Sequence, residues 1–236
     1  MAFAFSPKIV TNGLVLALDS ANTKSYVSGS TVWRDLTSNL TTGSLINSPT
    51  FNSANGGSIL FDGVDDYVDL VKDSLFNFGS SNFTISGWIN FSSVAGEKGF
   101  YSYFQADGPN QNNGLVIRLS TGNSPSGLRI VASITGTDVV MQSAWSPSIN
   151  TWYQILVVRN STTISAYINA VFLNSTTINI SIGTPSINKP VLAQTQTVLN
   201  SYLNGKLSLV QIYNRALSPT EVLQNYNATK SRFNIT

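Results

Sequence analysis

Carboxylates are the side chains of this chain best suited to chemistry, because the sequence contains neither histidine nor cysteine. The lack of histidine removes the commonest general base and zinc ligand, and the lack of cysteine removes thiolate ligands and disulfides. The chain has two glutamates, Glu97 in a glycine-flanked segment and Glu221 beside a Ser-Pro-Thr run. Hydrolysis of a glycosidic bond needs two neighbouring carboxyl groups in different protonation states, and no strand-like segment carries such a pair. We therefore expect no catalytic residues, and a protein that is not an enzyme.

Three aspartates, Asp62, Asp65 and Asp66, form the densest acidic cluster in the sequence. Their oxygens are the hard ligands that calcium prefers. Asp and Gly are also ordinary turn residues, and Gly63 lies within this cluster. We interpret the cluster as a turn, and we expect no cofactor.

Aromatic and amide side chains are the remaining candidates for binding. The chain has 4 Trp and 9 Tyr, and aromatic faces can pack on the apolar patches of sugars while Asn, Gln and Asp bond to the hydroxyl groups. Trp88 and Trp152 fall in strand-like runs, where we expect core packing. Tyr101, Tyr103 and Trp145 lie beside polar loops, and we regard these three as candidate ligand contacts.

Alternation of apolar and polar residues predicts many short strands. In the strand at 83–91, Phe83, Ile85, Ile89 and Phe91 share one face, which belongs to a core. Residues 58–70 break at Asp62-Gly63 and predict a hairpin with a tight turn, and residues 152–158 and 163–168 predict a second hairpin. Further strands are predicted at 13–19, 99–105, 114–119, 128–134, 138–142 and 203–213.

One helix signal occurs near the end of the sequence. Ser218 can cap a helix whose first residue is Pro219, and Glu221 can reach back to the cap, so we predict a single short helix at about 219–227. Many strands without intervening helices predict two packed antiparallel sheets. The predicted fold is an all-β, jelly-roll-like antiparallel β-sandwich forming one domain over residues 1–236, with a short N-terminal arm at 1–8.

Several segments, in this order, carry a family resemblance. They are FDGVDDYV (61–68), FTISGWINF (83–91), NTWYQILVV (150–158), AYINA (166–170) and LNGKLSLVQIYNRALSPTEV (203–222). The chain resembles the laminin-G-like and pentraxin-like branch of the concanavalin A-like lectin/glucanase superfamily. Its opening, IVTNGLVLALDSANTKSY with WRDL after it, is similar to an extension found on such domains in tailed-phage and bacterial surface proteins.

The resemblance implies where a calcium and ligand site would lie. The loop at 105–113 matches the segment in which pentraxin-like relatives carry an acidic-amide pair, and Asn112-Asn113 stand at that pair here. The partner segment matches 193–197, which has no carboxylate, and Ser208 stands where laminin-G-like relatives often have an acid. Because calcium affinity depends on ligand charge, we expect any site that includes Asp107 to be weak. The remaining candidate ligand-binding residues are Asp107, Asn110, Asn112, Asn113, Gln194 and Gln196.

Charge and composition limit the partners. Charged residues make up 10% of the chain and the net charge is +2, so we expect no binding to nucleic acid. No apolar run has the length of a membrane span and no secretion signal is evident, so we expect no membrane insertion. Low charge favours association of copies. Phe3 and Phe5 need a pocket, which belongs either to the same chain or to a neighbour, and in the second case the arm is an assembly contact.

Two functions fit these expectations. The first is a non-enzymatic structural protein of a virion surface, such as a capsid decoration or tail-fibre module, which binds itself or a scaffold protein and presents a glycan-binding face. The alternative is a carbohydrate-binding lectin or adhesin of a bacterial or viral surface, located outside the cell.

Overall fold

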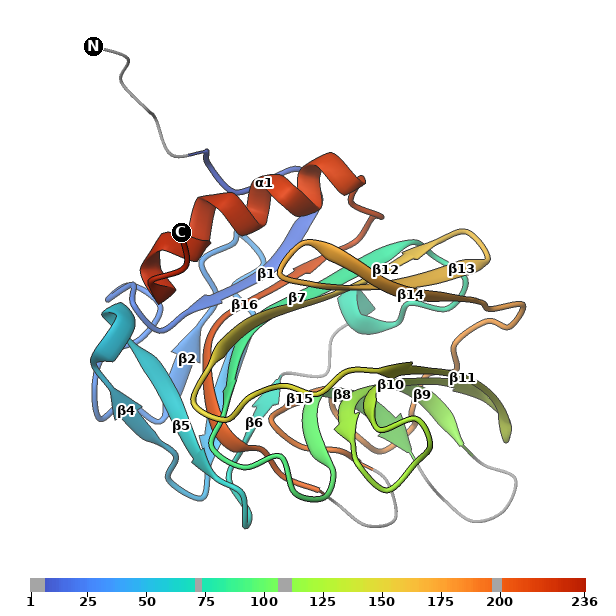
Figure 1. Ribbon diagram of the computed structural model, residues 1–236, viewed down its shortest axis with the longest axis horizontal. Helices are drawn as coiled ribbons and strands as arrows, with labels where there is room; N and C mark the ends of the chain where they lie inside the picture. The colour runs from blue at the N-terminus through green and yellow to red at the C-terminus, as the bar shows by residue number, and fades with distance from the viewer. Residues whose placement is uncertain (1–6, 71–73, 106–111, 197–200) are drawn as a thin grey trace.

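The computed structural model describes residues 7–70, 74–105, 112–196 and 201–236. Two eight-stranded antiparallel sheets lie face to face, and one α-helix covers the outer side of one of them (Figure 1). This architecture confirms the predicted all-β sandwich with a C-terminal helix. The predicted single domain stays a prediction, and the residues Phe3 and Phe5, expected to contribute to assembly, lie outside the described part of the chain.

We call the sheet beneath the helix sheet A. Its order is β14 (Val171–Thr177), β13 (Thr163–Ile168), β12 (Trp152–Asn160), β7 (Phe83–Phe91), β16 (Asn204–Tyr213), β5 (Ser58–Asp62) and β4 (Thr50–Asn52), with β1 (Leu14–Asp19) also paired to β16. Sheet B has the order β11 (Thr137–Ala144), β10 (Gly127–Ile134), β9 (Asn113–Ser120), β8 (Lys98–Gln105), β15 (Val191–Leu192), β6 (Tyr67–Leu70), β3 (Thr42–Ile46) and β2 (Val32–Arg34).

The main core fills the space between the sheets. Phe83, Ile85, Ile89 and Phe91 of β7 all belong to it, as the alternation predicts. Every residue of β7 is nevertheless buried, because the opposite face of this central strand is covered as well. The cover is α1 (Pro219–Thr229) followed by the 3₁₀ helix η3 (Lys230–Phe233).

Helix α1 begins as the sequence predicts. The Ser218 side chain accepts a hydrogen bond from the backbone N–H of Glu221, whose carboxylate in turn accepts from the backbone N–H of Ser218. Pro219 follows as the first helical residue. Val222 packs on Leu156, Val158 and other apolar residues on the outer face of sheet A, so the helix lies across the strands (Figure 1). Two further 3₁₀ turns are η1 (Ala54–Gly56) and η2 (Ser74–Phe76).

The predicted hairpin over residues 58–70 is wrong. Strand β5 pairs with β4 and β16 in sheet A, whereas β6 pairs with β3 and β15 in sheet B. Gly63 has a φ of 82° in the connection, and the Asp66 carboxylate accepts a hydrogen bond from the backbone N–H of Asp62 at 3.0 Å. Alternation shows that each segment has a buried face, but it does not tell in which sheet that face lies. The second predicted hairpin is confirmed as β12 and β13.

Arg232 binds the C-terminal segment to sheet A, near the point on β16 where its pairing changes from β5 to β1. Its guanidinium donates to the Asp19 carboxylate at 2.6 Å, to the carbonyl of Gly57 at 2.7 Å, and to the Ser208 hydroxyl. Its Nε donates to the carbonyl of Asn55 at 2.8 Å. One side chain therefore links η3 to three separate segments, which are β1, the turn at 55–57 and β16. No described helix is long and apolar enough to cross a membrane.

Candidate functional site

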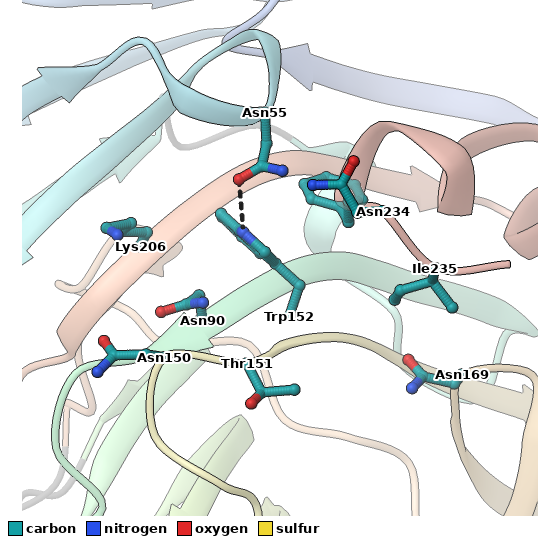
Figure 2. A pocket seen from close by; sticks show the side chains of 10 residues that line it. Asn55, Asn90, Asn150, Thr151, Trp152, Asn169, Lys206, Asn234 and Ile235 are labelled. Atoms are coloured by element: carbon teal, nitrogen blue, oxygen red, sulfur yellow. Dashed lines mark hydrogen bonds between the residues drawn. The ribbon is translucent and has the colours of Figure 1, made fainter.

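A cavity of about 540 Å³ opens on the outer face of sheet A, beside the end of η3 (Figure 2). Amide side chains are its main feature, and they come from Asn55, Asn90, Asn150, Asn169 and Asn234. Lys206 of β16 and Trp152 of β12 line it as well. Loops, strands and the C-terminal segment thus each contribute part of the wall. We call this hollow the amide cavity.

Stacked aromatic rings form the apolar side of the amide cavity. Phe233 of η3 lies 4.2 Å from Trp88 and 4.7 Å from Trp152 between ring centroids. The Trp152 indole N–H donates to the Oδ1 of Asn55 at 3.2 Å (Figure 2). The Asn55 amide group donates in turn to the carbonyl of Arg232 at 3.1 Å. These contacts hold the indole and the Asn55 amide in fixed positions.

Four of the five cavity asparagines occupy turn positions with a positive backbone φ. Asn55, Asn150, Asn169 and Asn234 have φ values of 56°, 58°, 51° and 58°, a left-handed conformation that asparagine tolerates better than most residues. Asn169 uses its Oδ1 as well, which accepts from the backbone N–H of Gln154 at 2.8 Å. The backbone conformation is therefore sufficient to explain why asparagine occupies these four positions, without a ligand.

Asn90 is different because it lies within strand β7, where asparagine is disfavoured. It is 3% exposed, and its Oδ1 is buried without a hydrogen-bond partner among the residues that the structure describes. A buried polar atom without a partner costs about 1–3 kcal/mol, so the fold alone gives no reason for this residue. Asn90 faces Trp152 on one neighbouring strand and Lys206 on the other, and Figure 2 shows all three beside the same cavity.

The amide cavity suits a polar ligand that carries several hydroxyl groups. Each asparagine side chain offers both donors and an acceptor, and Lys206 offers donors only. Lys206 has no ion-pair partner among the described residues. No carboxylate lines the cavity within the described chain, so its donor set does not fit a calcium ion.

The structure places those predicted ligand-binding residues that it describes mostly on sheet B, away from the amide cavity. Tyr101 and Tyr103 are 0% and 2% exposed and belong to the main core, so neither ring lies on the surface of the structure, and their contact with a ligand stays a prediction. Burial raises the pKa of the Tyr101 hydroxyl well above its ordinary value and also raises that of Tyr103. Residues 99–105 of β8 are all buried, so both faces of the strand are covered. The polar loop that follows it in the sequence gives no sign of this burial.

The other predicted ligand residues lie apart or already have partners. Asn112 donates to the carboxylate of Asp138 at 3.3 Å, and the Asn113 Oδ1 accepts from the backbone N–H of Thr135 at 2.9 Å. The Gln196 Oε1 accepts from the backbone N–H of Phe104 at 3.0 Å. Trp145 packs against Phe91 and Tyr153, and Gln194 is 8% exposed. Asp107 and Asn110 lie outside the described residues.

The acidic cluster forms the turn that connects β5 of sheet A to β6 of sheet B. Carboxylate oxygens of Asp62, Asp65 and Asp66 lie within 4.8 Å of one another. Backbone N–H groups, first that of Val64, hold the pKa of Asp62 below its ordinary value, while burial raises the pKa of Asp66. These hydrogen bonds agree with the turn interpretation. Whether calcium binds weakly here stays a prediction.

Comparison with known proteins gives the family. Residues 62–223 match the Laminin_G_3 model, described as the concanavalin A-like lectin/glucanases superfamily, and the chain belongs to this family. No curated protein matches the sequence. The resemblance identified from the motifs is thereby confirmed at the level of the superfamily, and the comparisons lend no support to its tailed-phage setting.

Solved structures share the fold at low sequence identity. Domain 4 of AbnA, a GH43 extracellular arabinanase from Geobacillus stearothermophilus, solved with arabinotriose, is 16% identical with a TM-score of 0.70, over 90% of this chain and 98% of that one. The binding domain of Paraclostridial Mosquitocidal Protein 1 is 22% identical with a TM-score of 0.69, over 92% of this chain and 52% of that one. Trypanosoma rangeli sialidase is 14% identical with a TM-score of 0.67, over 97% of this chain and 36% of that one.

Proposed function

We propose that this protein is a non-enzymatic carbohydrate-binding domain that acts outside the cell, and that the amide cavity holds the sugar. The observation that carries the proposal is Asn90, whose buried Oδ1 has no partner in the fold and lies at the cavity beside Lys206 and Trp152. A sugar hydroxyl would supply the missing donor. The arabinotriose bound by the AbnA domain is support from a protein of similar fold, which is analogy alone.

The arrangement of the glutamates supports a binding role rather than catalysis. Glu97 pairs with Arg118 at 3.3 Å, and Glu221 pairs with Arg215 at 2.6 Å while capping α1. Arg215 lowers the pKa of Glu221 to about 2, the opposite of what a general acid needs, and the Glu97 carboxylate is paired with Arg118. We therefore retain the expectation that the protein is not an enzyme.

The setting of the domain is a separate question. The comparisons favour the alternative, a lectin or adhesin, because the proteins of similar structure include a domain of an extracellular arabinanase and the binding domain of a mosquitocidal protein. The virion surface, with capsid decoration or tail-fibre assembly, has no support from them and remains a prediction. Homo-oligomerisation and attachment to a scaffold protein remain predictions as well.

A glycan array that includes arabinotriose, followed by calorimetric titration of each hit, tests the proposal. Asn90→Leu should lower the affinity for a hit roughly 10- to 100-fold, because loss of hydrogen bonds to a ligand costs about 1–3 kcal/mol. The same change should leave the melting temperature equal or higher, since leucine fits the same volume without an unpaired polar atom. Lys206→Ala should also weaken binding.

Matched controls are available on exposed surface. Asn179 and Lys24 are exposed, so Asn179→Ala and Lys24→Ala should bind as the wild type does. A hit whose affinity is the same for wild type and Asn90→Leu would exclude the amide cavity as its site. An array without any hit would count against carbohydrate binding itself.

A further inference from the structure

Two arginines lie side by side on the outer face of sheet B. Arg118 of β9 and Arg129 of β10 are direct cross-strand partners. Their sequence neighbours Ile117, Leu119 and Ile130 point into the main core, so the two arginine side chains project from the opposite face. Like charges directly opposite one another on a sheet are destabilising. This pair therefore needs a counterion.

The described residues supply one carboxylate for the two guanidinium groups. The Arg118 Nη2 lies 3.3 Å from the Oε1 of Glu97. The Arg129 Nη1 donates to the Oε1 of Gln142 at 3.2 Å, a neutral partner. The Nε atoms of both arginines are buried and have no hydrogen-bond partner in the described part of the chain. One positive charge and two directed N–H donors are thus left unmatched on this face.

An apolar row runs beside the arginine row. Val131 of β10 pairs with Val116 of β9 and with Val140 of β11. Each lies two residues along its strand from Arg129, Arg118 or Gln142, on the same face. Val140 is 38% exposed, so this strip is open to solvent at β11. Val116 and Val131 are 0% and 7% exposed, so a sugar ring could contact the row at Val140 while a charged substituent reaches the arginines.

We propose that Arg118 and Arg129 form a binding site for an anionic group, a carboxylate or a sulfate, carried by a glycan. The glycan part rests on the proposed function, whereas the anion site stands on the arginine pair alone. Guanidinium groups bind carboxylate and sulfate-like oxygens through paired N–H donors. Glu97 competes with the ligand for Arg118, and Arg129 provides the main attraction.

Titration with sodium glucuronate, sodium sulfate and glucose at low ionic strength tests this site. The readout is the set of arginine Nε–H signals in a ¹⁵N-labelled sample. Glucuronate, sulfate or both should shift the Arg118 and Arg129 signals, and glucose should not. Which anion binds more tightly tells whether the natural substituent is a carboxylate or a sulfate. Failure of both anions to bind would overturn the proposal.

Three variants make the test specific. Arg129→Gln should lower anion affinity at least tenfold, and Glu97→Gln should raise it several-fold because the internal competitor is gone. Arg34→Gln, at an exposed arginine on β2, should change nothing. Equal affinity in wild type and Arg129→Gln would contradict the proposal.

The amide cavity also contains a cation without an ion-pair partner among the described residues, Lys206, and is tested in parallel. Lys206→Ala should leave anion binding unchanged, and Arg129→Gln should leave binding of neutral glycan hits unchanged. Loss of anion binding in Lys206→Ala but not in Arg129→Gln would assign the anion to the amide cavity and reject the arginine site. The two proposals therefore fail independently.

Discussion

Asn90 and Arg232 show how single residues divide between function and stability. Asn90 has a buried oxygen for which the fold supplies no partner, so its replacement should cost binding and not stability. The guanidinium of Arg232 donates hydrogen bonds to the β1, η1 and β16 segments, so its replacement should cost stability. Replacing the amide of Asn90 in β7 and replacing the guanidinium of Arg232 in η3 should thus have opposite effects on stability.

Replacing Arg232 by methionine should destabilise the protein by about 2–4 kcal/mol. Its removal leaves the Asp19 carboxylate without its counterion, and charged hydrogen bonds that are partly shielded from water are worth about 1.5–3 kcal/mol each. Chemical denaturation with urea measures the change as a lower midpoint. Arg34→Met is the matched exposed control and should fall within about 0.5 kcal/mol of wild type. Equal midpoints for Arg232→Met and wild type would show that the C-terminal segment is not held by this side chain.

At the scale of an element, the start of α1 should respond to acid. The side chain of Arg215, with the backbone N–H of Ser218, lowers the pKa of Glu221 from 4.5 to about 2. A lowered pKa in the folded state stabilises the protein at all pH values above the unfolded pKa, and this contribution is lost as the pH falls towards 2. At pH 7 the Glu221→Gln variant should therefore be less stable by about 1 kcal/mol.

Melting curves between pH 7 and pH 2 measure this contribution. The gap between wild type and Glu221→Gln should be constant above pH 5 and should close between about pH 4.5 and pH 2. Ser218→Ala removes a neutral cap, so its gap should depend less on pH. Parallel curves for wild type and Glu221→Gln throughout this range would show that the ion pair with Arg215 contributes nothing.

Most strands and the helix could be predicted because their signals are local. The strand 83–91 and the helix start at Ser218 need only side-chain periodicity and capping chemistry. The pairing of β5 and β6 could not be predicted, since the turn residues Asp62 and Gly63 look the same whether a chain forms a hairpin or crosses between sheets. Strand β14 was missed because its burial pattern has little alternation, with Val171 and Phe172 both exposed.

At the scale of the whole molecule, the candidate sites lie on opposite outer faces of the sandwich. The amide cavity is on sheet A at the end of η3, and the arginine pair is on sheet B. Neither was predicted, because each depends on strand order. Asn90, Trp152 and Lys206 are far apart in the sequence, and they meet only because β7 lies between β12 and β16. A local signal did exist in the asparagine within FTISGWINF, which is out of place in a strand.

The central claim is that a sugar binds in the amide cavity, and the indole signal of Trp152 tests it most directly. In a ¹⁵N-labelled sample titrated with a glycan hit, the Trp152 indole N–H and the Asn90 side-chain amide should shift, since both groups line the cavity. The indole signal of Trp33, which is 0% exposed, should stay in place. Shifts confined to Asn112, Asn113 or Trp145, with Trp152 and Asn90 unchanged, would contradict the account and place the sugar elsewhere.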